Sequence, residues 1–196
     1  MLVQVKSAML TPNREAGFSL IELLITVAMV AILASLAVPT FRTFVINQQL
    51  SSTSSNFLGA LLQARSEAIK RGQIVALLPA NGTSWSSGWY LSVVNNSCAP
   101  TGATFAGTEP VGEFISIKTS GTTNSFAATN PSFAYGPVGF PYISCASPYY
   151  SGAMNGTLIF EAGATVREKR IIVSNSGRAR LCDPKTDTAS PPCSGG

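Results

Sequence analysis

The feature that most constrains this 196-residue chain is one apolar segment near its N-terminus. Residues 18–38 are 21 residues long and contain a single charged side chain, Glu22. As a helix that rises about 1.5 Å per residue, they would reach roughly 30 Å, the thickness of a bilayer core. Because basic residues such as Lys6 and Arg14 precede the segment, we expect a single span with residues 40–196 outside the cytoplasm.

Two ordinary interpretations compete for this segment. A secretory signal would have an apolar core of about 7–15 residues before a small-x-small cleavage site, for which Ser35-Leu36-Ala37 is a candidate, but the apolar run is longer. A plain membrane anchor would gain nothing from Glu22, because a carboxylate in lipid costs about 2–3 kcal/mol. A third interpretation accounts for the carboxylate.

The segment from Arg14 to Glu22, REAGFSLIE, resembles the N-terminus of type IV pilins and type II secretion pseudopilins. The resemblance implies that a prepilin peptidase cuts between Gly17 and Phe18, and that the new N-terminus on Phe18 is methylated. It also implies that Glu22 pairs with the terminal ammonium of a neighbouring subunit. A buried carboxylate is tolerable only with such a partner.

The same resemblance implies an α+β pilin fold, in which a long N-terminal helix packs on an antiparallel β-sheet head. We expect a leader peptide at 1–17, a transmembrane and filament-core helix at 18–39, an amphipathic helix half at 40–72 and a β-rich head at 73–196. Pro39 falls where the family tends to have proline, and it should kink or loosen the helix because it lacks an N–H donor.

The residue pattern after Pro39 agrees with this division. Six positions recur at helical spacing and predict one buried helix face: Leu50, Ser54, Phe57, Leu61, Ala64 and Ala68. Beyond Gly72 the pattern predicts about five to seven short strands, with candidates at 73–78, 89–94, 113–118, 132–135, 157–160 and 169–174. We expect Trp85 and Trp89 to fill the core or cover a sheet edge, with ligand stacking as the alternative.

Three further segments narrow the resemblance to the H-type pseudopilin and to FimT/FimU-type minor pilins. They are 63–71 (QARSEAIKR), 85–89 (WSSGW) and 171–182 (IIVSNSGRARLC). This resemblance implies a minor pilin in the tip or priming complex of a type IV pilus, with a minor pseudopilin of the type II secretion system as the alternative. The implied partners are a prepilin peptidase, other minor and major pilins, and the inner membrane. The chain would be held there as a single-pass protein with a periplasmic head, and later join an extracellular pilus.

The four cysteines are expected to form disulfides, because the head lies outside the cytoplasm. Cys182 and Cys193 are 11 residues apart, and their pairing would tie the C-terminal tail to the last strand. Cys98 and Cys145 would then form the second pair. The other two pairings of four cysteines stay open.

A basic strip lies near the C-terminus. Its cations are Arg167, Lys169, Arg170, Arg178, Arg180 and Lys185. The run Gly177-Arg178-Ala179-Arg180 matches a Gly-Arg-x-Arg pattern that FimT-type pilins use in DNA binding for natural transformation. On an extended segment Arg178 and Arg180 point to one side, and a glycine before them permits a turn. The resemblance therefore implies double-stranded DNA as a partner, which the protein would bind without sequence specificity. The alternative is that these arginines solubilise the strand or pair with carboxylates.

Catalysis is not expected. The chain has no histidine, which excludes a Ser-His-Asp triad and any His-ligated metal site. It also lacks a phosphate-binding loop, a nucleophile elbow and a C-x-x-C pair. We therefore expect neither a catalytic residue nor a metal or cofactor. The absence of histidine agrees with a subunit that assembles and makes contacts, and the net charge of +4 is modestly basic.

Overall fold

The computed structural model describes residues 17–102, 104–108, 110–120, 132–143, 147–148, 156–163, 167–187 and 193. The chain divides into two compact units, residues 1–41 and residues 42–196. Helix α1 (Leu20–Arg71) contributes to both units. The leader expected at 1–17 lies outside the described residues except for Gly17.

The first unit contains the start of α1, which exposes apolar side chains around its whole circumference. Phe18, just before the helix, is 76% exposed, and Leu20, Ile21, Val30 and Leu33 are exposed in the same way. Such a helix needs apolar surroundings, which the described residues do not supply. Among the described residues no single helix meets the length and composition of a membrane span, although the bent pair Leu20–Ser35 and Thr40–Arg71 does so together.

The second unit, the head, is built from two antiparallel sheets. The five-stranded sheet has the order β2-β1-β4-β5-β6 and the four-stranded sheet the order β3-β7-β8-β9. The strands of the first sheet are β1 (Val75–Pro79), β2 (Trp89–Val93), β4 (Phe133–Tyr135), β5 (Pro141–Ile143) and β6 (Ser147–Pro148). Those of the second are β3 (Ile115–Ser120), β7 (Gly156–Ala162), β8 (Glu168–Val173) and β9 (Ala179–Cys182). A short 3₁₀ helix, η1 (Trp85–Ser87), precedes β2.

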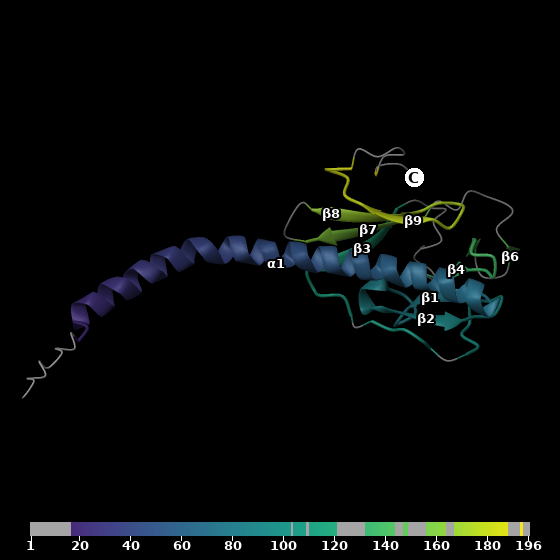
Figure 1. Ribbon diagram of the computed structural model, residues 1–196, viewed down its shortest axis with the longest axis horizontal. Coiled ribbons are helices and arrows are strands. Elements are labelled where there is room, and N and C mark those ends of the chain that lie inside the picture. Colours follow the sequence, from purple (N-terminus) through teal and green to yellow (C-terminus); the bar gives the residue numbers. More distant parts are fainter. Residues whose placement is uncertain are drawn as a thin grey trace, which may run out of the picture. The chain divides into compact units, whose positions relative to one another are not determined.

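The head portion of α1 packs against both sheets (Figure 1). The six helix positions predicted to form one face are all buried, so this prediction is confirmed. Phe57 lies at the centre of the core. Its ring makes edge contacts with Trp85, Trp89 and Phe160 at centroid distances of 5.2, 4.8 and 5.6 Å. Both tryptophans are buried in this core, which confirms the expectation that they fill the core or cover a sheet edge.

The predicted strands are all present, with bounds shifted by a few residues. The described residues hold nine strands rather than the expected five to seven. The three strands without a predicted counterpart are β5, β6 and β9. The expected antiparallel head also consists of two sheets. β3 follows β2 along the chain but pairs with β7, so the chain changes sheet between them.

Candidate functional site

The start of α1 brings Ser19 and Glu22 together. Ser19 caps the helix, because its carbonyl accepts from the Leu23 N–H at 3.2 Å and its hydroxyl accepts from the Glu22 N–H at 3.3 Å. Serine followed three residues later by glutamate is the capping-box pattern, a helix-start signal that the sequence itself contains. A carboxylate in the first helical turn also interacts favourably with the helix dipole. Glu22 therefore has a local function at this helix end besides the expected pairing with another subunit.

The predicted cleavage site adjoins this helix start, whereas Pro39 lies 17 residues beyond Glu22 in the sequence. Gly17 and Phe18 precede the helix in an open stretch, where a Cβ on Gly17 would meet nothing within 4 Å. This stretch is accessible to a peptidase. The side chain of Pro39 lies outside the described residues, so its effect on the helix stays a prediction.

The turn between β8 and β9 explains Gly177 of the Gly-Arg-x-Arg run. The Gly177 N–H donates to the Ser174 carbonyl at 2.8 Å, and Gly177 has a φ of 77°, in the left-handed region. A Cβ there would lie 2.7 Å from the Gly139 carbonyl oxygen. Both the backbone conformation and the close approach therefore require glycine.

Two side chains hold this turn from elsewhere in the head. Arg65 on α1 donates from Nη1 to the Gly177 carbonyl at 3.2 Å and from Nη2 to the Ser176 carbonyl at 3.1 Å. The Tyr135 hydroxyl donates to the same Gly177 carbonyl at 3.2 Å. Burial raises the pKa of Tyr135 well above its ordinary value, so the hydroxyl remains a donor. The Arg65 side chain is half-buried because it reaches these carbonyls.

Replacing Gly177 with alanine should destabilise the head. The left-handed conformation costs a non-glycine residue about 1–2 kcal/mol, and the clash with the Gly139 carbonyl adds to this. Thermal unfolding of the full chain in detergent should show a lower midpoint. Gly82 also has a positive φ of 76°, but a Cβ there meets nothing within 4 Å. Gly82→Ala should therefore lose less stability, and equal losses would contradict the role of the close approach.

The basic strip is divided between the two faces of the four-stranded sheet. Alternation along β8 places Lys169 on the face of Ile171 and Val173, which are buried in the core. Arg170 lies on the opposite face. Arg180 shares that outer face, since it pairs in register with Ile172. The structure thus brings Arg170 and Arg180 to one face and separates Lys169 from them.

Three of the six cations of the strip have a carboxylate partner among the described residues. Lys169 pairs with Asp183 at 3.3 Å, Arg170 with Glu168 at 2.7 Å and Arg180 with Asp187 at 3.3 Å. Arg178 and Lys185 are exposed, and among the described residues neither has a carboxylate partner. The positive charge open to an external partner is therefore smaller than the sequence suggested.

The Lys169–Asp183 pair predicts a dependence of stability on pH. Burial opposes ionisation of Asp183, but the Lys185 backbone N–H and the Lys169 ammonium outweigh it and lower the pKa of this carboxyl below its ordinary 3.8. A lowered folded-state pKa stabilises the fold above the ordinary value, and this stabilisation disappears as the pH falls through the folded-state pKa. Asp183→Asn should therefore melt lower than wild type at pH 7, with the gap closing well below pH 4. Melting curves across this range test it, and a gap of constant size would contradict it.

The C-terminal tail is fastened to β9. Cys182 and Cys193 form a disulfide with a Cα–Cα distance of 5.8 Å, as predicted. Arg170 Nη1 also donates to the Cys193 carbonyl at 3.4 Å. No described cysteine carries a free thiol, but Cys145 lies outside the described residues, so the Cys98–Cys145 pair stays a prediction.

Asp187 lies within 4.8 Å of the Cys182 and Cys193 sulfurs, which the disulfide prevents from acting as thiolate ligands.

Comparison with known families gives two matches. The family described as "Type II transport protein GspH" matches residues 53–177, more than half of the chain. The chain belongs to the GspH family. A second family, described as "Prokaryotic N-terminal methylation motif", matches residues 12–38, which include Gly17, Phe18 and Glu22. The GspH match ends at Gly177, so Arg178, Arg180 and the disulfide-tied tail lie beyond it.

Two solved structures are similar to this GspH-family chain. The type IV minor pilin FimU of Pseudomonas aeruginosa is 16% identical, with a TM-score of 0.55 over 71% of this chain and 95% of FimU. The minor pseudopilin EpsH of the Vibrio cholerae type 2 secretion system is 13% identical, with a TM-score of 0.49 over 69% of this chain and 98% of EpsH. At this identity, the likeness to FimU shows a shared fold.

Proposed function

We propose that this chain is a minor subunit of a type IV pilus. Prepilin peptidase cuts it between Gly17 and Phe18, the inner membrane stores it as a single-pass protein, and it then joins other minor and major pilins in the tip or priming complex. The observation that carries the proposal is the start of α1, which is apolar around its circumference with Glu22 as its one charged residue. In a filament, the apolar helices of neighbouring subunits cover one another, and Glu22 meets a terminal ammonium.

A deletion strain separates this function from the alternative, an H-type minor pseudopilin of the type II secretion system. The proposal expects loss of surface pili and of pilus-driven motility, with normal secretion of exoproteins. Complementation with the intact gene should restore motility. Loss of exoprotein secretion with normal piliation would favour the secretion system instead.

DNA contact is a second candidate function. It is supported by the turn between β8 and β9, in which Arg178 directly precedes β9. The turn at Gly177 holds Arg178 exposed beside Arg180, and Lys185 is exposed on the same C-terminal segment. Each phosphate that these cations neutralise adds about 0.9 to the slope of log affinity against log salt. The pairing of Arg180 with Asp187 makes Arg178 the stronger contributor.

A gel-retardation assay with duplex DNA and the full chain in detergent tests this contact. Arg178→Ala combined with Arg180→Ala should abolish retardation at low salt without unfolding the head. Lys118→Ala is the matched control, because Lys118 is a cation of the same sheet that is paired with Glu161 at 2.6 Å. Retardation that survives the double substitution would reject DNA contact and leave the filament proposal intact.

A further inference from the structure

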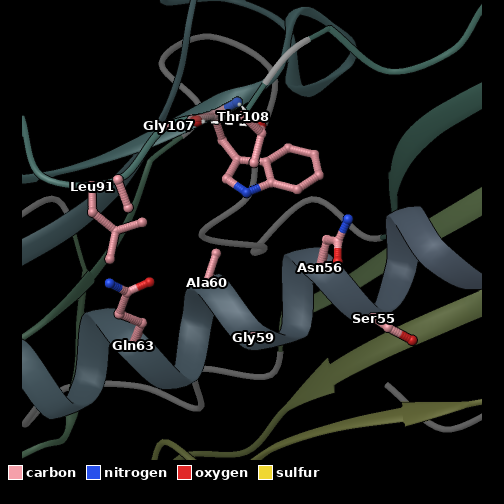
Figure 2. Close-up of a pocket in the computed structure, with 10 residues that line it drawn as sticks. Ser55, Asn56, Gly59, Ala60, Gln63, Leu91, Gly107 and Thr108 are labelled. Carbon is pink, nitrogen blue, oxygen red and sulfur yellow. Dashed lines mark hydrogen bonds between the residues drawn. The ribbon is translucent and has the colours of Figure 1, made fainter.

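A groove of about 310 Å³ lies between α1 and an edge of the five-stranded sheet. One wall is formed by Asn56, Gly59 and Gln63 of α1, and the other by Gly107 and Thr108, which follow the outer side of β2 (Figure 2). The lining residues are small, amide, hydroxyl or apolar residues, and none is ionisable. A charged side chain entering this groove would lose water without gaining a partner.

Each wall carries a glycine that the head itself does not need. Gly59 is exposed in the middle of α1, where glycine destabilises a helix relative to alanine, and a Cβ there would meet nothing within 4 Å. A Cβ on Gly107 would make only ordinary contacts at 4.0 Å. Neither residue has a positive φ. The absence of side chains at these two positions keeps the groove open rather than relieving any internal clash.

The edge at Gly107 has unused backbone groups. The neighbouring residues bond to β2: the Leu91 N–H donates to the Ala106 carbonyl at 2.9 Å, and the Thr108 N–H donates to the Trp89 carbonyl at 2.9 Å. Gly107 lies opposite Tyr90 in this antiparallel pairing, without a bond between them. Its own N–H and carbonyl therefore point away from β2, and within the described part of the chain no group bonds to them.

The lining also contains a polar group that lacks a partner. Trp89 is only 2% exposed, and its indole N–H finds no acceptor among the described residues. Buried donors are nearly always paired, so this one is a position where a bound acceptor would be favourable. Together with the free edge at Gly107, the groove offers hydrogen-bonding groups suited to a peptide backbone.

We propose that the groove binds an extended, uncharged segment of a neighbouring pilin-like subunit. The segment adds as a strand to the edge at Gly107 and passes close to α1 at Gly59. Backbone donors and acceptors of an edge favour an extended partner, and strands added in this way lie about 4.8 Å apart. The amide side chains of Asn56 and Gln63 favour a polar backbone over an apolar helix. This assignment rests on the proposed filament function. It specifies the groove as the place where the head contacts a neighbouring subunit of the filament.

Filling the groove tests the assignment. Gly59→Leu places a side chain in the open space, whereas Ser52→Leu places the same side chain on an exposed part of α1 outside the groove. Each full-length variant is expressed in the deletion strain, and its amount in sheared filaments is compared with wild type. Gly59→Leu should be incorporated at least tenfold less, yet melt no lower than wild type, because a glycine has left a helix. Ser52→Leu should be incorporated normally.

The possible outcomes separate the two proposals. If wild-type chain is absent from filaments, the filament function itself is wrong. If wild type is present and Gly59→Leu is incorporated equally well, only the groove assignment is wrong. A loss that is as large for Ser52→Leu also overturns the groove assignment, since the whole helix surface would then be sensitive.

A photo-crosslinking residue identifies the occupant. p-Benzoylphenylalanine replaces Gln63 in the groove, or Gln48 on an exposed part of α1 outside it, in cells that assemble the full chain. Sequencing of the crosslinked peptide from position 63 should find an uncharged, non-helical segment of another pilin-like subunit, absent from the position-48 sample. A crosslink to lipid, to a helix or to a second copy of this chain would overturn the assignment. The absence of any crosslink from position 63 would overturn it too.

Discussion

Phe57→Ala is expected to lower the free energy of unfolding by about 3–5 kcal/mol, the range for removing a large buried aromatic side chain. Phe57 is fully buried, and its ring touches Trp85 and Trp89 near the five-stranded sheet and Phe160 in the four-stranded sheet. Truncation would leave a cavity that neither sheet can close alone. Since a typical domain is stable by only about 5–15 kcal/mol, this variant should be partly unfolded at 37 °C.

Tryptophan fluorescence during urea unfolding of the full chain in detergent measures this loss, because both tryptophans of the protein contact Phe57. Leu62→Ala is the matched control on the same helix, where Leu62 is 47% exposed. That variant should lose less than about 1 kcal/mol. Similar losses for both variants would show that Phe57 does not connect the two sheets as described.

Glu22→Gln should be cut by the prepilin peptidase but be at least tenfold less abundant in assembled filaments. Glutamine keeps the capping-box pattern with Ser19, so the start of α1 is preserved while the negative charge is lost. Without that charge, a neighbouring terminal ammonium enters the apolar filament core unpaired, which is costly. Immunoblots of membranes and of sheared filaments measure cleavage and incorporation separately.

Ser19→Ala is the converse control. It removes the helix cap, at a cost of about 1 kcal/mol, but keeps the Glu22 carboxylate. It should therefore assemble nearly as well as wild type. If Ser19→Ala fails to assemble while Glu22→Gln succeeds, the glutamate acts through the helix end and pairing between subunits is refuted.

The parts of the fold that local pattern could predict were the helix face and the longer strands. Leu50 to Ala68 follow helical spacing closely, because one side of α1 must be apolar whatever it packs against. By contrast, β9 has the sequence Ala-Arg-Leu-Cys, without a β-branched or aromatic residue, and β5 begins with Pro141. Such strands form because tertiary packing and an existing neighbour favour them, which overrides weak local propensity.

The candidate sites also divide into those that a local sequence pattern predicts and those that depend on tertiary packing. Ser19-x-x-Glu22 is a local pattern and was readable from the sequence. Arg65 is 112 residues from Gly177, so no local pattern could reveal that it binds the turn. The pairing of Lys169 with Asp183 shows the same limit, since these residues meet only through the register of β8 with β9.

The change of sheet at β3 has a consequence for how the head matures after export. When the chain reaches β3, the five-stranded sheet is still incomplete, because β4 comes later along the chain. β3 itself has no partner strand until β7 is available. Contacts between residues so far apart in sequence slow folding, since long loops must close first. If the head crosses the inner membrane as proposed, beginning with the residues next to α1, neither sheet can be completed early. With the proposed periplasmic placement, we expect the head to fold only after nearly all of it has been translocated, and its unfolded intermediate to be a substrate for periplasmic chaperones.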